Sequence, residues 1–249
     1  MDVDRAESFG AADRADWFRT THWSVILAAA RDESPQSRVE ALEKLCHTYW
    51  YPLYAFIRRK GHTATEAEDL TQEFFARLLR GSFPSGIKPQ GGKFRSYLLT
   101  ALQHFLTNEW ESARAQKRGG DKVILSWQRL NAEDRYRNEP ADEVTPEILF
   151  DRRWASVLLE RVRRQLAEEC SSDGKADVFK RLQPCLTGAE PMMPYADLAR
   201  QMDVSESAVK MSVHRLRKRY GELLRQEISQ TVASPKDVEE EIRSLLAAL

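Results

Sequence analysis

The stretch YADLARQMDVSESAVKMSVHRLRKR, residues 195–219, is the most informative part of this chain. Its apolar residues recur at helical spacing on both sides of a polar break, which predicts two short helices joined by a tight turn. The expected buried positions are Leu198, Ala199, Val209, Val213 and Leu216. Val204 is expected to fill the turn, and Ser205 to cap the second helix by accepting hydrogen bonds from its free backbone N–H groups. This is the spacing of a helix-turn-helix.

The second predicted helix is strongly basic. Residues 205–225 carry six Lys or Arg and two Glu, a net charge of +4, in a chain whose 38 basic and 38 acidic residues balance. Such a helix suits the major groove of DNA, where cations hold phosphates and base edges are read. An ordinary helical hairpin with a solvated charged face shows the same spacing, so it is the charge that favours DNA. The residues expected to contact DNA here are Ser205, Ser207, Lys210, Arg215 and Lys218.

Outside this stretch, helical periodicity continues along almost the whole chain, so an all-α fold is predicted. The expected helices cover residues 21–30, 35–60, 65–79, 94–117, 146–169, 177–186 and 238–249, and Val123–Leu125 is the one strand-like run. Residues 133–151 hold seven acids and two arginines, a net charge of −5, which is typical of an acidic linker. The predicted organisation is an N-terminal extension (1–34), a first helical domain (35–118), a linker (119–145), a helix-turn-helix domain (146–231) and a C-terminal helical extension (232–249).

Composition argues against several classes of protein. The longest apolar run, Val25–Ala30, is far shorter than the roughly 20 residues of a membrane span, and the polar, acidic N-terminus does not resemble a secretory signal. A cytoplasmic protein is therefore expected. Three cysteines without a CxxC pair predict reduced, buried thiols. Cys46, His47 and His62 lack a second pair at zinc-ligand spacing, so a metal site is not expected.

The helix predicted over residues 65–79 carries an acidic stripe. Glu66, Asp69 and Glu73 fall at positions i, i+3 and i+7, so they share one side of the helix. A solvated face is the ordinary explanation of such a stripe, and acid–base catalysis is another. No nucleophile, phosphate loop or metal pattern accompanies the carboxylates, which argues against an enzyme. The opposite side is apolar, with Ala67, Leu70, Phe74 and Leu78.

With these segments in this order, the chain resembles the bacterial RNA polymerase sigma factors of the sigma-70 family, extracytoplasmic-function (ECF) type. The segment EDLTQEFF, residues 68–75, resembles the family's acidic polymerase-binding motif. The segment FRSYL, residues 94–98, is similar to the start of its helix for the upstream-ten promoter element. The helix-turn-helix is similar to the domain that reads the upstream-thirty-five element. The resemblance spans roughly residues 36–230 and implies two helical domains joined by an acidic linker.

The resemblance implies a protein that binds core RNA polymerase, directs promoter-specific initiation and helps to melt promoter DNA, with catalysis left to the polymerase and no cofactor. Asp69, Gln72 and Glu73 would contact the clamp of the largest polymerase subunit. The loop at residues 82–93 is similar in position to one that captures a flipped base. An anti-sigma factor is a further candidate partner. In the first domain the implied DNA contacts are Lys93, Arg95, Gln103, His104, Asn108 and Arg114.

The chain departs from the family pattern in its first domain, at Gln103, His104 and near Asn108, and in its helix-turn-helix, at Asp203 and Ser212. Members of the family commonly carry an arginine and an asparagine where this chain has Gln103 and His104, so their base contacts are not transferred. In the turn, Asp203 replaces the usual glycine. Aspartate tolerates a left-handed backbone better than most residues, so the turn is still expected to form.

Two other classes of function stay open on the residues alone. A free-standing helix-turn-helix regulator would bind a palindrome as a dimer, although it does not need the first 120 residues. A nucleic-acid enzyme would use the carboxylate stripe together with a divalent metal. The C-terminal helix, residues 238–249, is expected to fold against the rest of the protein or a partner, either by packing onto the second domain or by covering its basic helix. Glu239, Glu240 and Glu241 are expected opposite its apolar stripe.

Overall fold

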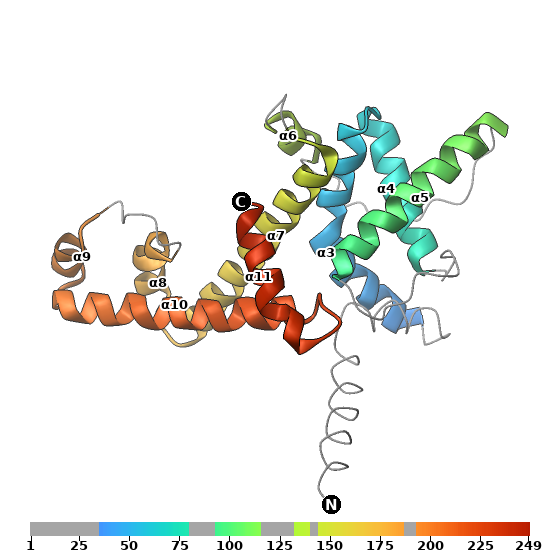
Figure 1. Ribbon diagram of the computed structural model, residues 1–249. Helices are drawn as coiled ribbons and strands as arrows, with labels where there is room; N and C mark the ends of the chain where they lie inside the picture. Colours follow the sequence, from blue (N-terminus) through green and yellow to red (C-terminus); the bar gives the residue numbers. More distant parts are fainter. Residues whose placement is uncertain (1–34, 80–92, 116–131, 140–143, 187–192) are drawn as a thin grey trace, which may run out of the picture. The chain divides into compact units, whose positions relative to one another are not determined.

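The computed structural model describes residues 35–79, 93–115, 132–139, 144–186 and 193–249 (Figure 1). Within these ranges the chain forms nine α-helices and no β-sheet, which confirms the predicted all-α class for the part described. Lys93 and Val232 form an isolated antiparallel bridge. The predictions for residues 21–30, the loop at 82–92 and Val123–Leu125 fall outside the described residues.

The chain divides into two compact units. The first contains the residues up to Ser156 together with Ile228–Leu249, and the second contains Val157–Glu227. The first unit is therefore assembled from two parts of the sequence that the second unit separates.

Helix α3 (Pro35–Arg59) lies at the centre of the first unit. Between Leu45 and Ile57 it is buried on almost every side, beyond the single stripe that its periodicity predicts. The reason is its aromatic content, because aromatic rings need neighbours on several sides. The ring of Tyr49 lies edge-on to Phe94 at a centroid distance of 5.3 Å, and Trp50 stacks on Tyr54 at 5.3 Å. Helices α4 (Ala64–Leu79) and α5 (Phe94–Ala115) pack around it (Figure 1).

The described part of the predicted linker is a short helix, α6 (Ala132–Arg137), which belongs to the first unit. Its carboxylate Glu133 accepts hydrogen bonds from Tyr54 Oη at 2.7 Å and from Arg58 Nη2 at 2.9 Å. Glu139, just beyond the helix, accepts one from Tyr51 Oη at 2.7 Å. Glu133 and Glu139 belong to the acidic run that predicted a linker, but in the structure they accept hydrogen bonds from tyrosines and an arginine of α3.

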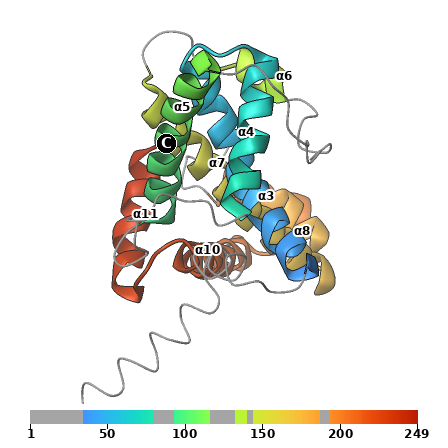
Figure 2. The ribbon, with the colours of Figure 1, turned by 90° about the vertical axis from the view of Figure 1, so that its right-hand side faces the viewer.

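Helix α11 (Val238–Ala247) also belongs to the first unit, so the prediction that it packs onto the second domain is wrong. It lies beside α7 (Pro146–Ser172) in Figure 1 and beside α5 in Figure 2. Arg152 Nε on α7 donates to the carbonyl of Ala248 at 3.3 Å. Glu241 is fully buried, contrary to its expected place on the outer side. It follows Val238 by three residues and precedes Leu245 by four, so it lies in the apolar stripe itself.

The second unit holds the rest of α7, α8 (Ala176–Leu182), α9 (Tyr195–Met202) and most of α10 (Glu206–Ser229). Its core contains Leu198, Ala199, Val209 and Val213, as predicted, and Leu216 packs against it. Val204 is 44% exposed, so the prediction that it fills the turn is wrong. Leu182 and Cys185 belong to the same buried cluster.

The turn between α9 and α10 follows the prediction at two residues. Asp203 has φ 52° and ψ 46°, the left-handed conformation that ends α9, and its N–H bonds to carbonyls of α9. Ser205 Oγ accepts a hydrogen bond from the N–H of Ala208 at 3.2 Å, which caps α10. A connection of only three residues therefore joins the two helices.

Candidate nucleic-acid and partner interfaces

Helix α4 begins with a capping box. Glu66 Oε2 accepts hydrogen bonds from the N–H of Thr63 at 2.8 Å and from Thr63 Oγ1 at 2.9 Å, while Thr63 Oγ1 accepts one from the N–H of Glu66 at 3.3 Å. The backbone hydrogen bond from Thr63, followed by the side-chain one, lowers the pKa of Glu66. This member of the acidic stripe therefore starts the helix, and its carboxylate is already engaged.

The three residues expected to contact polymerase differ in their exposure. Asp69 is half-buried, and Glu73 is half-buried and pairs with Arg77 Nε at 3.0 Å. Arg77 also binds Glu109 on α5 at 2.5 Å, which holds the two helices together. Gln72 is buried, so its amide does not lie on the surface. A contact with a partner can therefore be direct at Asp69 and Glu73 but not at Gln72 in this conformation.

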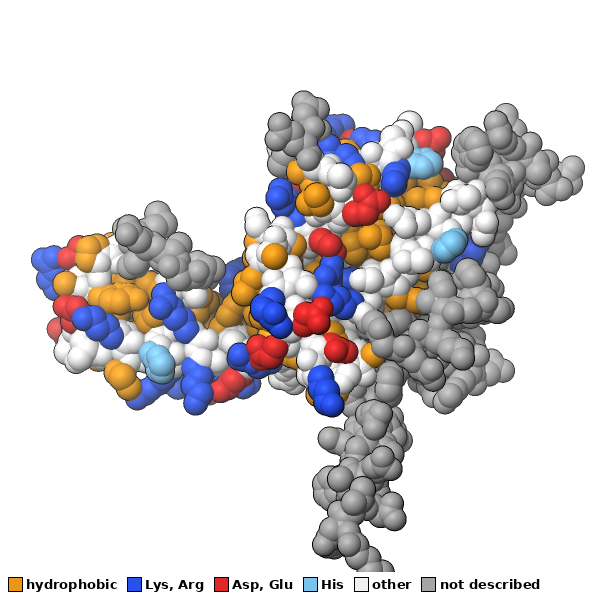
Figure 3. Space-filling model, viewed as in Figure 1, with side chains coloured by type: hydrophobic (Ala, Val, Ile, Leu, Met, Phe, Trp, Pro, Cys, Tyr) orange, Lys and Arg blue, Asp and Glu red, His pale blue; other side chains and the backbone are white. Residues whose placement is uncertain are grey.

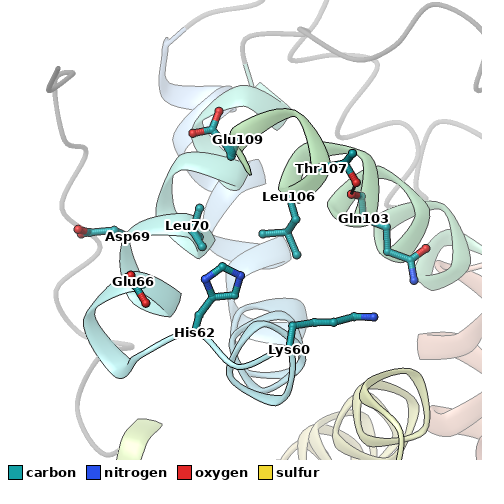
Figure 4. Close-up of a pocket in the computed structure, with 9 residues that line it drawn as sticks. All are labelled: Lys60, His62, Glu66, Asp69, Leu70, Gln103, Leu106, Thr107 and Glu109. Atoms are coloured by element: carbon teal, nitrogen blue, oxygen red, sulfur yellow. Dashed lines mark hydrogen bonds between the residues drawn. The ribbon is translucent and has the colours of Figure 1, made fainter. Parts of the chain in front are cut away.

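A groove of about 870 Å³ runs between the end of α3, α4 and α5 (Figure 4). Leu70 and Leu106 face each other across it, with the ring of His62 between them and Asp69 at its edge (Figure 4). An apolar floor inside a polar rim is the usual anatomy of a protein-binding surface. The groove also brings together Asp69 and Gln103, which the sequence assigned to polymerase and to DNA respectively. Its other lining residues are Lys60, Glu66, Thr107 and Glu109.

The predicted DNA-contacting residues on the middle of α5 are exposed. Gln103, His104 and Asn108 all lie on the surface of the helix, and Gln103 Nε2 donates to Glu147 Oε1 at 3.1 Å. The side chain of Arg114 lies outside the described residues. One exposed stretch of α5 thus remains accessible to a ligand.

The two predicted DNA-contacting residues at the start of α5 are in a different situation. Lys93 pairs with Glu240 at 3.3 Å and with Glu241 at 3.1 Å, and Arg95 Nε pairs with Glu241 at 2.6 Å. Arg95 is buried, and its guanidinium also binds Asp151. In this conformation both cations are therefore neutralised by carboxylates of the first unit.

In the second unit the predicted DNA-contacting residues are all exposed. Lys and Arg side chains follow α10 in Figure 3, and Lys210 makes an i,i+4 pair with Glu206 at 2.7 Å. Other arginines of α10 hold the unit together: Arg217 Nε donates to the carbonyl of Cys185 at 2.8 Å, and Arg219 pairs with Glu169 at 2.8 Å. The exposed set predicted from sequence is Ser205, Ser207, Lys210, Arg215 and Lys218.

Sequence reasoning missed Met211 on the same helix. Its side chain is 52% exposed, and helical geometry places it opposite Val209, Val213 and Leu216, between Ser207 and Lys218. The signal was present, because a methionine outside the apolar register of an amphipathic helix faces solvent.

Across the described ranges, no group of three or more His, Cys, Asp or Glu is arranged to hold a metal ion. The three cysteines are free and buried, as predicted. None of the described helices is both long and apolar enough to cross a membrane.

Residues 47–116 match the family model of Sigma-70 region 2, which coincides with the larger part of α3 and with α4 and α5. The chain therefore carries a sigma-70 region 2 domain. Region 2 implies a non-enzymatic role in transcription initiation and promoter melting, and it implies binding to core RNA polymerase. No curated protein and no solved structure matches the chain.

Proposed function

We propose that this chain is a two-domain sigma factor of the ECF type. Its first unit binds core RNA polymerase and the upstream-ten element, and its second unit contains a helix-turn-helix that reads the upstream-thirty-five element. The observation that carries the proposal is the region 2 match over residues 47–116, because it supports this class of protein independently of any single residue. The protein acts in the cytoplasm, where polymerase is found.

The polymerase contact in this proposal is made by α4. Asp69 and Glu73 are the accessible members of its acidic stripe, and charged residues at a rim steer a partner of opposite charge. The neighbouring groove with Leu70 and Leu106 supplies apolar area next to those charges. Direct contact is proposed for Asp69 and Glu73, and Gln72 is excluded from it by its burial.

The DNA contacts are made by α5 and α10. Exposed polar side chains on α5, namely Gln103, His104 and Asn108, are suited to unstacked bases, and unpairing a base costs about a few kcal/mol that such contacts offset. On α10 the exposed cations suit phosphates and guanine edges. The left-handed turn at Asp203 and the cap at Ser205 support the helix-turn-helix assignment.

The test is reconstitution with core polymerase. Run-off transcription on a genomic library should become promoter-specific when the protein is added, and core polymerase alone should not initiate at the same sites. Tight, specific binding to duplex DNA without polymerase would instead indicate a free-standing regulator. Divalent-metal-dependent cleavage of DNA that Glu73→Ala abolishes would indicate an enzyme.

A further inference from the structure

The segment after α10 binds the start of α5 through its backbone. The N–H of Phe94 donates to the carbonyl of Thr231 at 2.8 Å, and Lys93 and Val232 form an antiparallel bridge. The first N–H groups of a helix have no partner within the helix and are a favourable place for an anion. Here a carbonyl of the chain's own C-terminal segment occupies one of them.

Helix α11 then neutralises the two cations at the same helix start. Lys93 Nζ lies 3.3 Å from Glu240 and 3.1 Å from Glu241, and it donates to Ser244 Oγ at 2.8 Å. Arg95 Nε lies 2.6 Å from Glu241 Oε1, and its guanidinium stands 5.0 Å from the centre of the Trp154 ring. The side chain of Glu241 has no exposed area. These carboxylates occupy the positions that phosphates would take on the same cations.

The stability of the fold requires the ion pairs of Arg95 but not the ion pair between Lys93 and Glu240. Arg95 is buried, and an unpaired buried charge is strongly destabilising, so its pairs with Glu241 and Asp151 are required by the fold. Burial lowers the pKa of Arg95, but the hydrogen bonds that it donates to Glu241 and Asp151 outweigh this effect and raise the pKa overall. Lys93 is more accessible, and a pair between it and the exposed Glu240 adds little stability. The pair with Glu240 instead makes the ammonium group of Lys93 unavailable to a nucleic-acid phosphate at the start of α5.

We propose that the C-terminal segment, residues 231–249, is an intramolecular competitor of nucleic acid at the start of α5. With the segment closed, Lys93 and Arg95 are unavailable, and DNA binding by the first unit requires that the segment move away. The apparent affinity is then reduced by the fraction of molecules in which the segment is open. This inference rests on the proposed function, because it concerns the regulation of the same DNA-binding helix.

The experiment measures binding of the free full-length protein to a fluorescein-labelled single-stranded oligonucleotide of mixed sequence by anisotropy. Glu240→Gln removes an exposed partner of Lys93 and should tighten binding roughly two- to five-fold. Glu241→Gln weakens both pairs and should tighten it by about tenfold or more. Each cation that is freed to reach a phosphate should steepen the slope of log K against log salt by about 0.7, so about 1.4 for both.

A third variant is expected to change the affinity in the opposite direction, which separates the proposed competition from a general effect of misfolding. Ser244→Asp places another carboxylate beside Lys93 and should weaken binding by closing the segment more firmly. Two control variants change the same charge elsewhere on α11: Glu239→Gln for the Glu→Gln variants and Ala247→Asp for Ser244→Asp. Both positions are exposed, and each control should change the affinity less than its matched variant.

Amide exchange provides an independent readout. The N–H of Phe94 is bonded to Thr231 in the closed state, so its protection should fall when the oligonucleotide is bound. The proposal that the C-terminal segment competes with nucleic acid would be overturned by either of two results. One is protection of the Phe94 N–H that persists in the complex, and the other is folded Glu240→Gln and Glu241→Gln variants that bind no tighter than wild type. If promoter-specific run-off transcription is nevertheless observed, the proposed function stands and this inference alone fails. If no variant binds DNA and transcription is not directed, both fail.

Discussion

Asp203 shows how one residue can set the geometry of the turn in the proposed helix-turn-helix. It is the only non-glycine residue with positive φ among the residues described, and side chains with a Cβ atom are disfavoured there by roughly 1 to 2 kcal/mol, less for aspartate. Asp203→Gly should therefore raise the free energy of unfolding by up to about 1 kcal/mol, and Asp203→Val should lower it by more than about 1 kcal/mol. Urea unfolding followed by circular dichroism measures both.

The control for this pair is Asp177→Gly on α8, where the backbone is helical and glycine should lower stability by about 0.5 kcal/mol. A loss of stability on Asp203→Gly would mean that the aspartate side chain, and not the backbone conformation, holds the turn.

Asp69 and Glu73 carry the prediction for polymerase binding. Reversing both charges, Asp69→Lys with Glu73→Lys, should lower the affinity for core polymerase by on the order of 100-fold, because attraction at the interface becomes repulsion. The fold should survive, since the pair between Glu73 and Arg77 is partly exposed and contributes about 1 kcal/mol or less. Co-purification with core polymerase measures binding. Glu168→Lys with Asp173→Lys makes the same charge change at exposed positions of the second unit and should leave binding intact.

The residues whose roles could be predicted from the sequence act through local contacts, whereas those whose roles could not be predicted act through contacts with distant parts of the chain. Asp203 and Ser205 act through local backbone rules that span a few residues, so the turn could be read directly. Arg95 and Glu241 are 146 residues apart, and nothing local reveals their partnership. A weaker signal did exist, because Arg95 lies in register with Leu98 and Leu102, as Glu241 does with Val238 and Leu245. A charge inside an apolar stripe predicts burial with a partner, although it does not name the partner.

At the scale of an element, helix α6 is bound to α3 through the carboxylate of Glu133, and the strength of this contact depends on the negative charge of that group. The hydrogen bond from Arg58, and then that from Tyr54, lower the pKa of Glu133 against the effect of its burial. A lowered folded-state pKa means that its contribution is present above the unfolded pKa, about 4.3, and is lost as pH falls through the folded value. The protection factors of the amides in residues 132–137, taken relative to intrinsic exchange at each pH, should therefore fall on acidification below about pH 4.3, and Glu133→Gln should show low protection at neutral pH as well. Protection factors in wild type that do not change over this range would contradict the role of Glu133.

Helix α10 carries two kinds of arginine and lysine, and they should respond differently to mutation. Lys210→Ala, Arg215→Ala and Lys218→Ala should each weaken promoter binding by the reconstituted holoenzyme and reduce its salt slope by about 0.9 for each lost phosphate contact. Core-polymerase affinity should stay the same. Arg219→Ala is the matched control, because its guanidinium is bound to Glu169, so it should lower stability more than it changes the salt slope. Equal promoter occupancy for the first three variants would contradict α10 as the DNA reader.

For the whole molecule, the order of helices along the chain could be predicted, whereas the grouping of those helices could not. Helical periodicity located α3 to α5, α7, α8 and α11 to within a few residues, because it depends only on local spacing, whereas α10, expected as a short helix, continues to Ser229. The assignment of the last 22 residues to the first unit depends on long-range contacts such as the one between Phe94 and Thr231. The first unit, which contains the region 2 match, is therefore completed by residues that follow the second unit in sequence.

Deleting residues 231–249 should consequently destabilise the first unit and spare the second. Val232 and Leu245 are fully buried, each contributing about 1.5 to 3 kcal/mol, and Arg95 would lose Glu241 while staying buried. The loss should exceed about 3 kcal/mol, and amide exchange should rise across α3, α4 and α5 but not across α8 and α9. Equal loss of protection in both units would show that they unfold together. Unchanged protection in α5 would show that region 2 is complete without the C-terminal segment, and the segment could then move away from Lys93 and Arg95 with little loss of stability.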